Sequence, residues 1–219
     1  MSSEGDSGSS LYKVYRITAT ALSLIILVGL TIYIFYDSFQ TTTLYSWHPS
    51  FFTLGFSLLM AESILVLSKD NVLFFLHPSV QKTVRAHHWI IQIIAAICNL
   101  VGFVTIILNK NRSGRSHFVS DHAIVGLVAT ILCFVTCAGG FITLYATKLK
   151  DWIKPSHNKL IHTIIGILTF VLGVAAEATG LELLRDEPVV IATIVLLAVA
   201  SFVVFEGSVK SAYSRIKRL

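Results

Sequence analysis

Long apolar stretches alternate with short polar ones along the whole chain. Windows of about 20 predominantly apolar residues, the length a helix needs to cross a bilayer, begin near Ile17, Trp47, His88, His122, Lys159 and Pro188. Because the polar stretches between these windows are short, neighbouring helices are expected to run antiparallel and to pack side by side. The pattern predicts an all-α membrane protein with six transmembrane helices, in which the second to fifth form a four-helix core and the first and last are peripheral.

The two ends of the chain differ from the apolar part between them. Residues 1–16 begin with a polar, Gly/Ser-rich stretch that lacks the basic segment of a signal peptide. We therefore predict a disordered tail over 1–16, a six-helix domain over 17–207 and a basic tail over 208–219. This division leaves no stretch for a separate soluble domain.

Composition agrees with a membrane protein. Of the 219 residues, 54% are hydrophobic and only 13% are charged, whereas charged residues make up about 25% of typical soluble domains. The sequence pI is about 9.2, but the basic residues border the apolar windows and do not form a stripe with stacking aromatic residues. This arrangement argues against a nucleic-acid partner and makes membrane lipid the expected surroundings.

The basic residues concentrate in the segments that would share one side of the membrane. That side would hold Lys13, Arg16, Lys69, Lys82, Arg85, Lys148, Lys150, Lys154, Lys159, Lys210, Arg215, Lys217 and Arg218. The opposite side would hold Lys110, Arg112, Arg115 and Arg185, together with a glycosylation sequon at Asn111. By the positive-inside rule both termini are expected in the cytoplasm. The endoplasmic reticulum, a vesicle and the plasma membrane all remain open, and a homodimer is a further possibility.

Four of the eight histidines stand at the start of a core helix, namely His48, His88, His122 and His162. Successive members are separated by one helix and one loop. Helical periodicity favours His88 over its neighbour His87, because the face of His88 carries polar and small residues. Those residues are Gln92, Ala95, Asn99 and Gly102, whereas the face of His87 carries Ile91, Ile94 and Cys98.

The faces beneath His122 and His162 carry small residues. They are Gly126, Ala129, Cys133, Thr136 and Gly140 on one helix, and Gly166, Thr169, Gly173, Ala176 and Gly180 on the other. Small faces serve close helix packing in membranes, but below a histidine they also make room for a bulky group. The cysteines Cys98, Cys133 and Cys137 lie inside apolar windows and are expected to be buried thiols.

Alternate helices of an antiparallel bundle start on the same side, which pairs the histidines. His48 and His122 are expected to meet on the non-cytoplasmic side, and His88 and His162 on the cytoplasmic side. Imidazole pairs on facing helices hold b-type haem through its iron, so the sequence predicts two haem b cofactors. The alternatives are interfacial or hydrogen-bonded core histidines, and a zinc site for which Asp121 is the one nearby acidic ligand.

Several motifs also resemble the cytochrome b561 family of transmembrane reductases. W-H-P, followed by Gly55 and Glu62, is similar to the pattern of the family's second helix, and S-D-H-A-I-V-G is similar to that of its fourth. I-H-T-I-I-G-I-L-T-F-V-L-G-V-A-A-E-A-T-G resembles the fifth helix almost throughout. The short loops, S-W-H-P and H-W resemble the animal domain-containing branch of the family.

The resemblance implies a transmembrane reductase that takes electrons from cytoplasmic ascorbate. It implies monodehydroascorbate radical and ferric iron as acceptors on the other side. Lys82, Arg85 and Lys159 would bind the ascorbate anion, although a basic residue beside a membrane is often only a topology marker. His117 and Phe118 would line the acceptor site, the alternative for His117 being an exposed loop residue.

Departures from the family pattern concern the substrates. The family's Tyr-Arg at the end of the second helix is here L-S-K, and the Trp after the fourth-helix histidine is Ile124. Three acidic residues fall in or beside apolar windows. We expect Glu62 to face the bundle as a structural or haem-edge residue, Glu177 to turn off the small face, and Glu206 to reach water.

Two other functions fit a six-helix membrane protein. A haem-free transporter would show helices interrupted by Gly and Pro and inward charges, whereas Pro49 and Pro188 here lie at helix starts. A structural adaptor would use the small faces for partner helices. Bound haem distinguishes the reductase from both.

Overall fold

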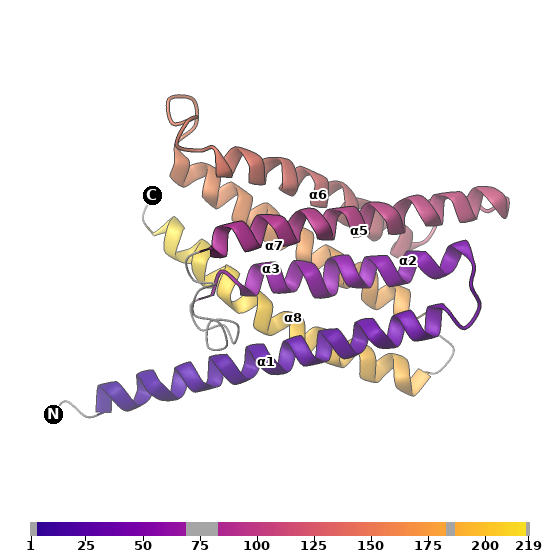
Figure 1. The fold of residues 1–219 in the computed structure, drawn as a ribbon, viewed down its shortest axis with the longest axis horizontal. Helices are drawn as coiled ribbons and strands as arrows, with labels where there is room; N and C mark the ends of the chain where they lie inside the picture. The colour runs from indigo at the N-terminus through magenta and orange to yellow at the C-terminus, as the bar shows by residue number, and fades with distance from the viewer. Residues whose placement is uncertain (1–3, 69–82, 183–186, 218–219) are drawn as a thin grey trace.

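The computed structural model describes residues 4–68, 83–182 and 187–217, with side chains from Ser10 onward. Within these ranges the chain is helical and contains no strand, and six helical segments run up and down (Figure 1). The segments are α1 (Glu4–Ser38), the consecutive α2 (Leu44–Phe52), η1 (Thr53–Met60) and α3 (Ala61–Leu65), then α5 (Val84–Arg112), α6 (Asp121–Leu144), α7 (Pro155–Leu181) and α8 (Glu187–Ile216).

Five of these segments, all except the second, are long and apolar enough to cross a membrane within the described residues. The second consists of α2, η1 and α3, which run without a break from Leu44 to Leu65. At about 1.5 Å per residue, such a helix also spans a hydrocarbon core of about 30 Å. The all-α membrane fold predicted from the apolar windows is therefore confirmed.

The beginning of α1 and the end of α8 lie side by side at one end of the bundle (Figure 1). We call this end, which holds the start of α1 and the end of α8, the termini end. The segment α2–η1–α3 packs along α5, and α6 packs along α7, so these four segments form two helical hairpins. Helices α1 and α8 pack on each other, and α8 also packs on α7. They are thus the peripheral pair.

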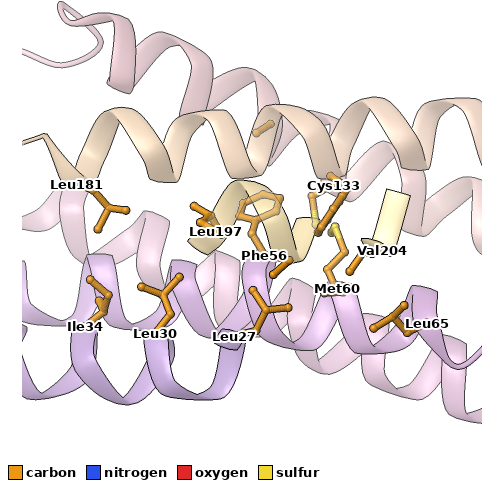
Figure 2. Close-up of a cluster of buried hydrophobic side chains, with 14 of the residues drawn as sticks. Leu27, Leu30, Ile34, Phe56, Met60, Leu65, Cys133, Leu181, Leu197 and Val204 are labelled. Atoms are coloured by element: carbon orange, nitrogen blue, oxygen red, sulfur yellow. The ribbon is translucent and has the colours of Figure 1, made fainter. Parts of the chain in front are cut away.

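The side chains are distributed as expected for a protein surrounded by lipid. Large apolar side chains point outward, for example Ile25 (67% exposed) and Phe202 (68% exposed), whereas the small polar Ser50 and Ser57 are fully buried. Lipid offers no hydrogen bonds, so polar groups are placed inside the bundle. An apolar cluster, drawn in Figure 2, joins α1 and α8 to the second segment through residues such as Leu27, Leu197 and Phe56.

The second segment changes from α-helix to π-helix over Thr53–Met60, which the apolar pattern does not predict. Pro49 lies one turn earlier inside α2, where it lacks the backbone N–H of a regular helix. The π-helix carries Gly55 against Asn99 and the carbonyl of Ala95 on α5, so close that a side chain at Gly55 would overlap Asn99. A π-helix inserted in a longer helix is frequent at functional sites.

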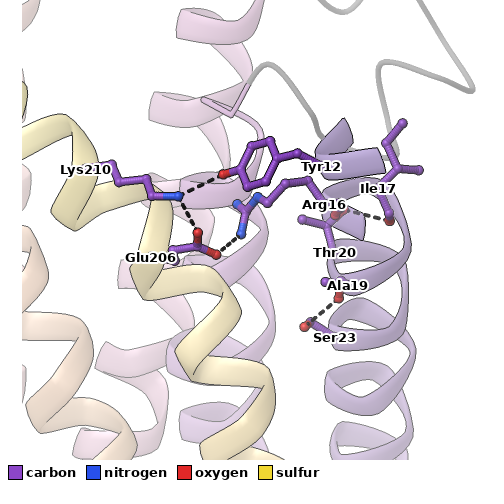
Figure 3. Close-up of polar contacts among 8 residues, drawn as sticks. All are labelled: Tyr12, Arg16, Ile17, Ala19, Thr20, Ser23, Glu206 and Lys210. Carbon is purple, nitrogen blue, oxygen red and sulfur yellow. Dashed lines mark hydrogen bonds and ion pairs between the residues drawn. The ribbon is translucent and has the colours of Figure 1, made fainter. Parts of the chain in front are cut away.

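Helices extend into both of the segments predicted as tails. Helix α1 begins at Glu4 and α8 continues to Ile216, so 4–16 and 208–216 are helical. Contacts that sequence periodicity does not reveal join the beginning of α1 to the last turns of α8 (Figure 3). Arg16 pairs with Glu206 at 2.5 Å, and Lys210 donates to the Tyr12 hydroxyl at 2.8 Å. Glu206, expected to reach water, thus holds α8 to α1.

Glycine-to-alanine changes test the packing of this bundle. A Cβ at Gly173 would overlap the ring of Phe56, which is 3% exposed and stacks on Phe52. Because that ring has no room to move, we expect Gly173→Ala to destabilise the protein by about 1–3 kcal/mol. The measurement is the thermal unfolding midpoint in detergent, followed by circular dichroism. Gly29→Ala is the matched control, since a Cβ there meets nothing within 4 Å, and an equal loss of stability in both variants would contradict the packing.

Candidate functional site

Histidine rings meet in two pairs, one toward each end of the bundle. His48 of α2 and His122 of α6 have ring centroids 5.9 Å apart, with an angle of 84° between the rings. His88 of α5 and His162 of α7 have centroids 6.3 Å apart at 89°. The second pair lies toward the termini end, because α5 and α7 begin there (Figure 1). The structure therefore brings together the residues that the helix spacing pairs.

Three of the four rings are oriented by a backbone carbonyl on a neighbouring helix. Nδ1 of His48 bonds to the oxygen of Gly102 at 3.2 Å, and Nδ1 of His88 to that of Ser63 at 2.8 Å. Nδ1 of His122 bonds to the oxygen of Ala176 at 2.8 Å. A carbonyl only accepts, so Nδ1 must carry the proton in each case. The remaining nitrogen, Nε2, is then a free lone pair suited to a metal ion.

His162 differs from the other three. Its Nδ1 is buried and has no hydrogen-bond partner among the described residues. The ring lies against Gly139 and Gly140 of α6, within ordinary contact distance of where their side chains would begin. The ring thus packs against two glycines, and the backbone of Thr136 on α6 lies beside it without a close hydrogen bond like those of the other three rings.

Glycine also makes room for the ring of His122. A Cβ at Gly180 of α7 would lie 2.9 Å from Cε1 of His122, closer than real side-chain contacts allow. Gly180, on one of the small faces identified in the sequence, thus admits the ring of His122, and Gly140 on the other face lies in contact with the ring of His162. This explains why helices that carry bulky rings pack as closely as α6 and α7 do.

The two hairpins are related by an internal repeat. An offset of 74 residues carries His48 to His122, His88 to His162 and Gly102 to Ala176. The hydrogen bonds from His48 to Gly102 and from His122 to Ala176 accordingly have the same sequence separation of 54. The same offset relates Arg85 to Lys159. The site is thus built twice from one helical hairpin.

The structure also separates the adjacent histidines. His87 bonds to the carbonyl of Thr83 in its own helix at 3.0 Å, whereas His88 reaches across to Ser63 and faces His162. This is the assignment that the two helical faces predict. His87 belongs to the outer surface of the hairpin.

Basic residues stand beside the pair at the termini end. Arg85 is exposed and Lys159 half-buried, and each lies three residues before a paired histidine, in the first turns of α5 and α7. Residues at this spacing share a helical face. Lys82, the third predicted substrate residue, lies outside the described residues.

The loop before α6 carries the predicted acceptor residues. His117 donates from Nε2 to the side-chain oxygen of Asn111 at 2.8 Å, and its Nδ1 is buried without a partner among the described residues. Phe118 has a left-handed backbone (φ 53°) and stacks on Phe103 of α5. This conformation is uncommon and costly for a bulky residue, so the surrounding loop must hold it. The sequon residue Asn111 is thereby tied to His117.

A polar contact in the middle of the bundle was not found from the sequence. Ser57 of η1 donates to one carboxylate oxygen of Glu177 on α7, and the Thr53 side chain of η1 also lies against this buried carboxyl group. Helical periodicity places Glu177 off the small face but does not identify a partner on another helix. Glu62 lies half-buried in α3, next to the Ser63 carbonyl that accepts from His88.

The thiols form part of the same interior. Cys98 and Cys133 are buried and Cys137 is half-buried, and all three are free. The amide of Asn99 donates to the sulfur of Cys133 at 3.6 Å and thereby links α5 to α6. Within the described residues no group of three or more His, Cys, Asp or Glu side chains gathers as a metal site would require. The candidate sites are therefore the two imidazole pairs.

Comparisons with known proteins agree with this arrangement. Residues 47–185 match the family model of eukaryotic cytochrome b561. The bovine transmembrane reductase CYB561D2 is 31% identical over 216 residues, which cover 96% of each chain. The human protein of that name is 32% identical over 83% of this chain and 80% of its own. The mouse probable transmembrane reductase CYB561D1 is 33% identical over 73% of this chain and 69% of its own. The chain therefore belongs to the cytochrome b561 family, in its domain-containing branch.

Proposed function

We propose that the protein is a transmembrane reductase that carries electrons from ascorbate at the termini end of the bundle to an acceptor at the opposite end. The proposed acceptors are the monodehydroascorbate radical and ferric iron. The observation that carries this proposal is the presence of two imidazole pairs, one toward each end of one membrane-spanning bundle. The names of the curated relatives support the same class of activity. By the distribution of basic residues, the termini end faces the cytoplasm.

The histidine pairs fit b-type haem. Metal–imidazole bonds are about 2 Å long in zinc sites, and each ring adds roughly 1 Å from nitrogen to centre, so two rings on opposite sides of one metal ion have centroids roughly 6 Å apart. The two observed separations are 5.9 and 6.3 Å. A free Nε2 on His48, His88 and His122 supplies the required lone pair. His48 and His122 would hold one haem, and His88 and His162 the other.

Bound haem supplies one-electron redox chemistry that imidazole alone lacks. The chain's own residues would bind the haem and orient the histidine rings that hold it. The carbonyls of Gly102, Ser63 and Ala176 keep the protons on Nδ1 and the lone pairs on Nε2. A hydrogen bond from Nδ1 to a carbonyl oxygen raises the basicity of a metal-binding imidazole.

Charge and location support the substrate assignments. Ascorbate is an anion at neutral pH, and Arg85 and Lys159 present cations one turn from the proposed histidine ligands at the termini end. Lys82 is proposed as a third cation from its sequence position. At the other end, His117 and Phe118 lie in the loop that leads into His122. His117 offers an unprotonated Nδ1 that can accept a proton when an acceptor is reduced.

Haem content tests the cofactor assignment. We expect about two haems per wild-type chain, and about one after His162→Ala, because one of the two histidines that would hold the haem at the termini end is then lost. The measurements are a pyridine haemochrome assay and a dithionite-reduced minus oxidised spectrum of purified protein. His87→Ala is the matched control and should retain both haems. Loss of a haem in the control would contradict the pairing, and a wild-type chain without haem would indicate a transporter or an adaptor.

The donor site is tested by charge removal at the termini end. We expect Arg85→Gln and Lys159→Gln each to raise the KM for ascorbate roughly fivefold, since one charged contact is worth about 1 kcal/mol. Haem content should stay unchanged. Stopped-flow reduction of the haem by ascorbate measures the effect, and Arg112→Gln at the opposite end provides the control. If all three variants behave alike, these residues are topology signals only.

The acceptor site is tested by a change at the other end. His117→Ala should slow reoxidation of the reduced protein by a ferric chelate by about tenfold, a conservative value for loss of a proton-transfer group. Reduction by ascorbate should remain as in the wild type. Reoxidation is followed spectroscopically after rapid mixing. An unchanged reoxidation rate would remove His117 from the acceptor site.

A further inference from the structure

A half-enclosed cavity lies at the termini end, between the peripheral helices and the core. Its volume is about 180 Å³, far more than the about 10–15 Å³ that one water molecule requires. It is lined by residues of α1, α7, α8 and the end of the second segment, among them Arg16, Ser68, Thr163, Ser208, Ser211 and Arg215. None of the described residues assigned above to haem, ascorbate or acceptor lines it.

Two arginines from different helices give this cavity its charge. Arg16 of α1 is only 3% exposed and pairs with Glu206 of α8 (Figure 3). Glu206 is shared with Lys210 at 2.5 Å, so one carboxylate faces two cations here. Arg215 adds a third cation. The three cations and the one carboxylate together carry a net charge of +2.

Arg215 carries an unsatisfied donor at this place. Its Nε is buried and has no hydrogen-bond partner among the described residues. Leaving a buried donor of a charged group unpaired is costly, which indicates that the arginine has a partner when the protein is in its membrane. The hydroxyls of Ser68, Ser208 and Ser211 line the same cavity and can donate further hydrogen bonds.

We propose that this cavity binds a phosphate group, carried either by an anionic lipid or by a free cytoplasmic anion. Guanidinium forks and hydroxyl donors match phosphate geometry. Basic pockets between transmembrane helices on the cytoplasmic side bind lipid headgroups in this way. A separate apolar groove of about 250 Å³ lies between α7 and α8 nearer the bilayer centre, lined by residues such as Phe170, Val174 and Phe202. It offers space for an acyl chain beside the same helix pair.

The location gives the ligand a function. The cavity wall includes Thr163, which follows His162, and Ile64, which follows the Ser63 carbonyl that orients His88. A bound phosphate would tie α8 to α7 and to the second segment beside these two residues. It would therefore stabilise the part of the bundle that positions the histidine pair at the termini end.

Thermal stability of the full, detergent-purified chain tests the proposal without using its activity. The probes are dioctanoyl phosphatidic acid, dioctanoyl phosphatidylcholine and inorganic phosphate at constant ionic strength. We expect dioctanoyl phosphatidic acid, inorganic phosphate or both to raise the unfolding midpoint in a saturable way. Dioctanoyl phosphatidylcholine should have no comparable effect. Protection by phosphatidic acid alone identifies the ligand as a lipid headgroup, and protection by inorganic phosphate alone identifies it as a free anion. Protection by both indicates that the site recognises the phosphate group itself.

Variants distinguish the cavity from general basicity. Arg215→Gln should weaken the apparent affinity for the protecting probe about tenfold or more, as expected for the loss of a charged fork. Ser211→Leu should do the same by filling the space while keeping the charge. Lys217→Gln, two residues along and outside the cavity lining, should respond like the wild type. Equal protection by phosphatidylcholine, no protection by any probe, or wild-type affinity in both cavity variants would overturn the proposal.

Discussion

The hydrogen bond between an imidazole and a backbone carbonyl of the next helix is the interaction on which this bundle depends. In lipid every polar group needs a partner inside the protein, and a histidine on a membrane helix cannot use water. His48, His88 and His122 each bond to a carbonyl on a neighbouring helix. One contact thus satisfies a buried donor, joins two helices and sets the free nitrogen of the ring. The same hydrogen bonds therefore hold the helices of each hairpin together and set which ring nitrogen is free.

Small residues make those bonds possible. The three accepting carbonyls belong to residues with a small side chain or none, which lets the two backbones approach. At Gly102 a Cβ would press on Phe52 and on the His48 carbonyl. The repeat of 74 residues reproduces this arrangement in the second hairpin, with one difference. The ring of His162 rests on glycines, and the backbone of Thr136 lies beside it without a close hydrogen bond like those of the other three rings. The two imidazole pairs are thus held by different contacts.

Periodicity along the chain was sufficient to predict the helices and to choose His88 over His87, because both depend on which residues share a helical face. It could not predict features that depend on contacts between distant segments. Arg16 and Glu206 are 190 residues apart, and Ser57 and Glu177 are 120 apart. The first contact joins α1 to α8 at the termini end. The π-helix at Thr53–Met60 equally escapes an analysis that assumes 3.6 residues per turn.

The distribution of charge differs between the four core segments and the peripheral helices α1 and α8. Inside the four core segments the polar side chains are mostly neutral, such as Asn99, Thr130 and Thr169, which are all buried. The closely paired charges of Arg16, Glu206 and Lys210 lie between α1 and α8 at the termini end. Because a charge costs least near the membrane surface, the ion pairs of the peripheral helices lie there, as do Arg85 and Lys159 in the first turns of α5 and α7. The core is then free to be shaped by ring packing and carbonyl bonds, and the outer pair by electrostatics.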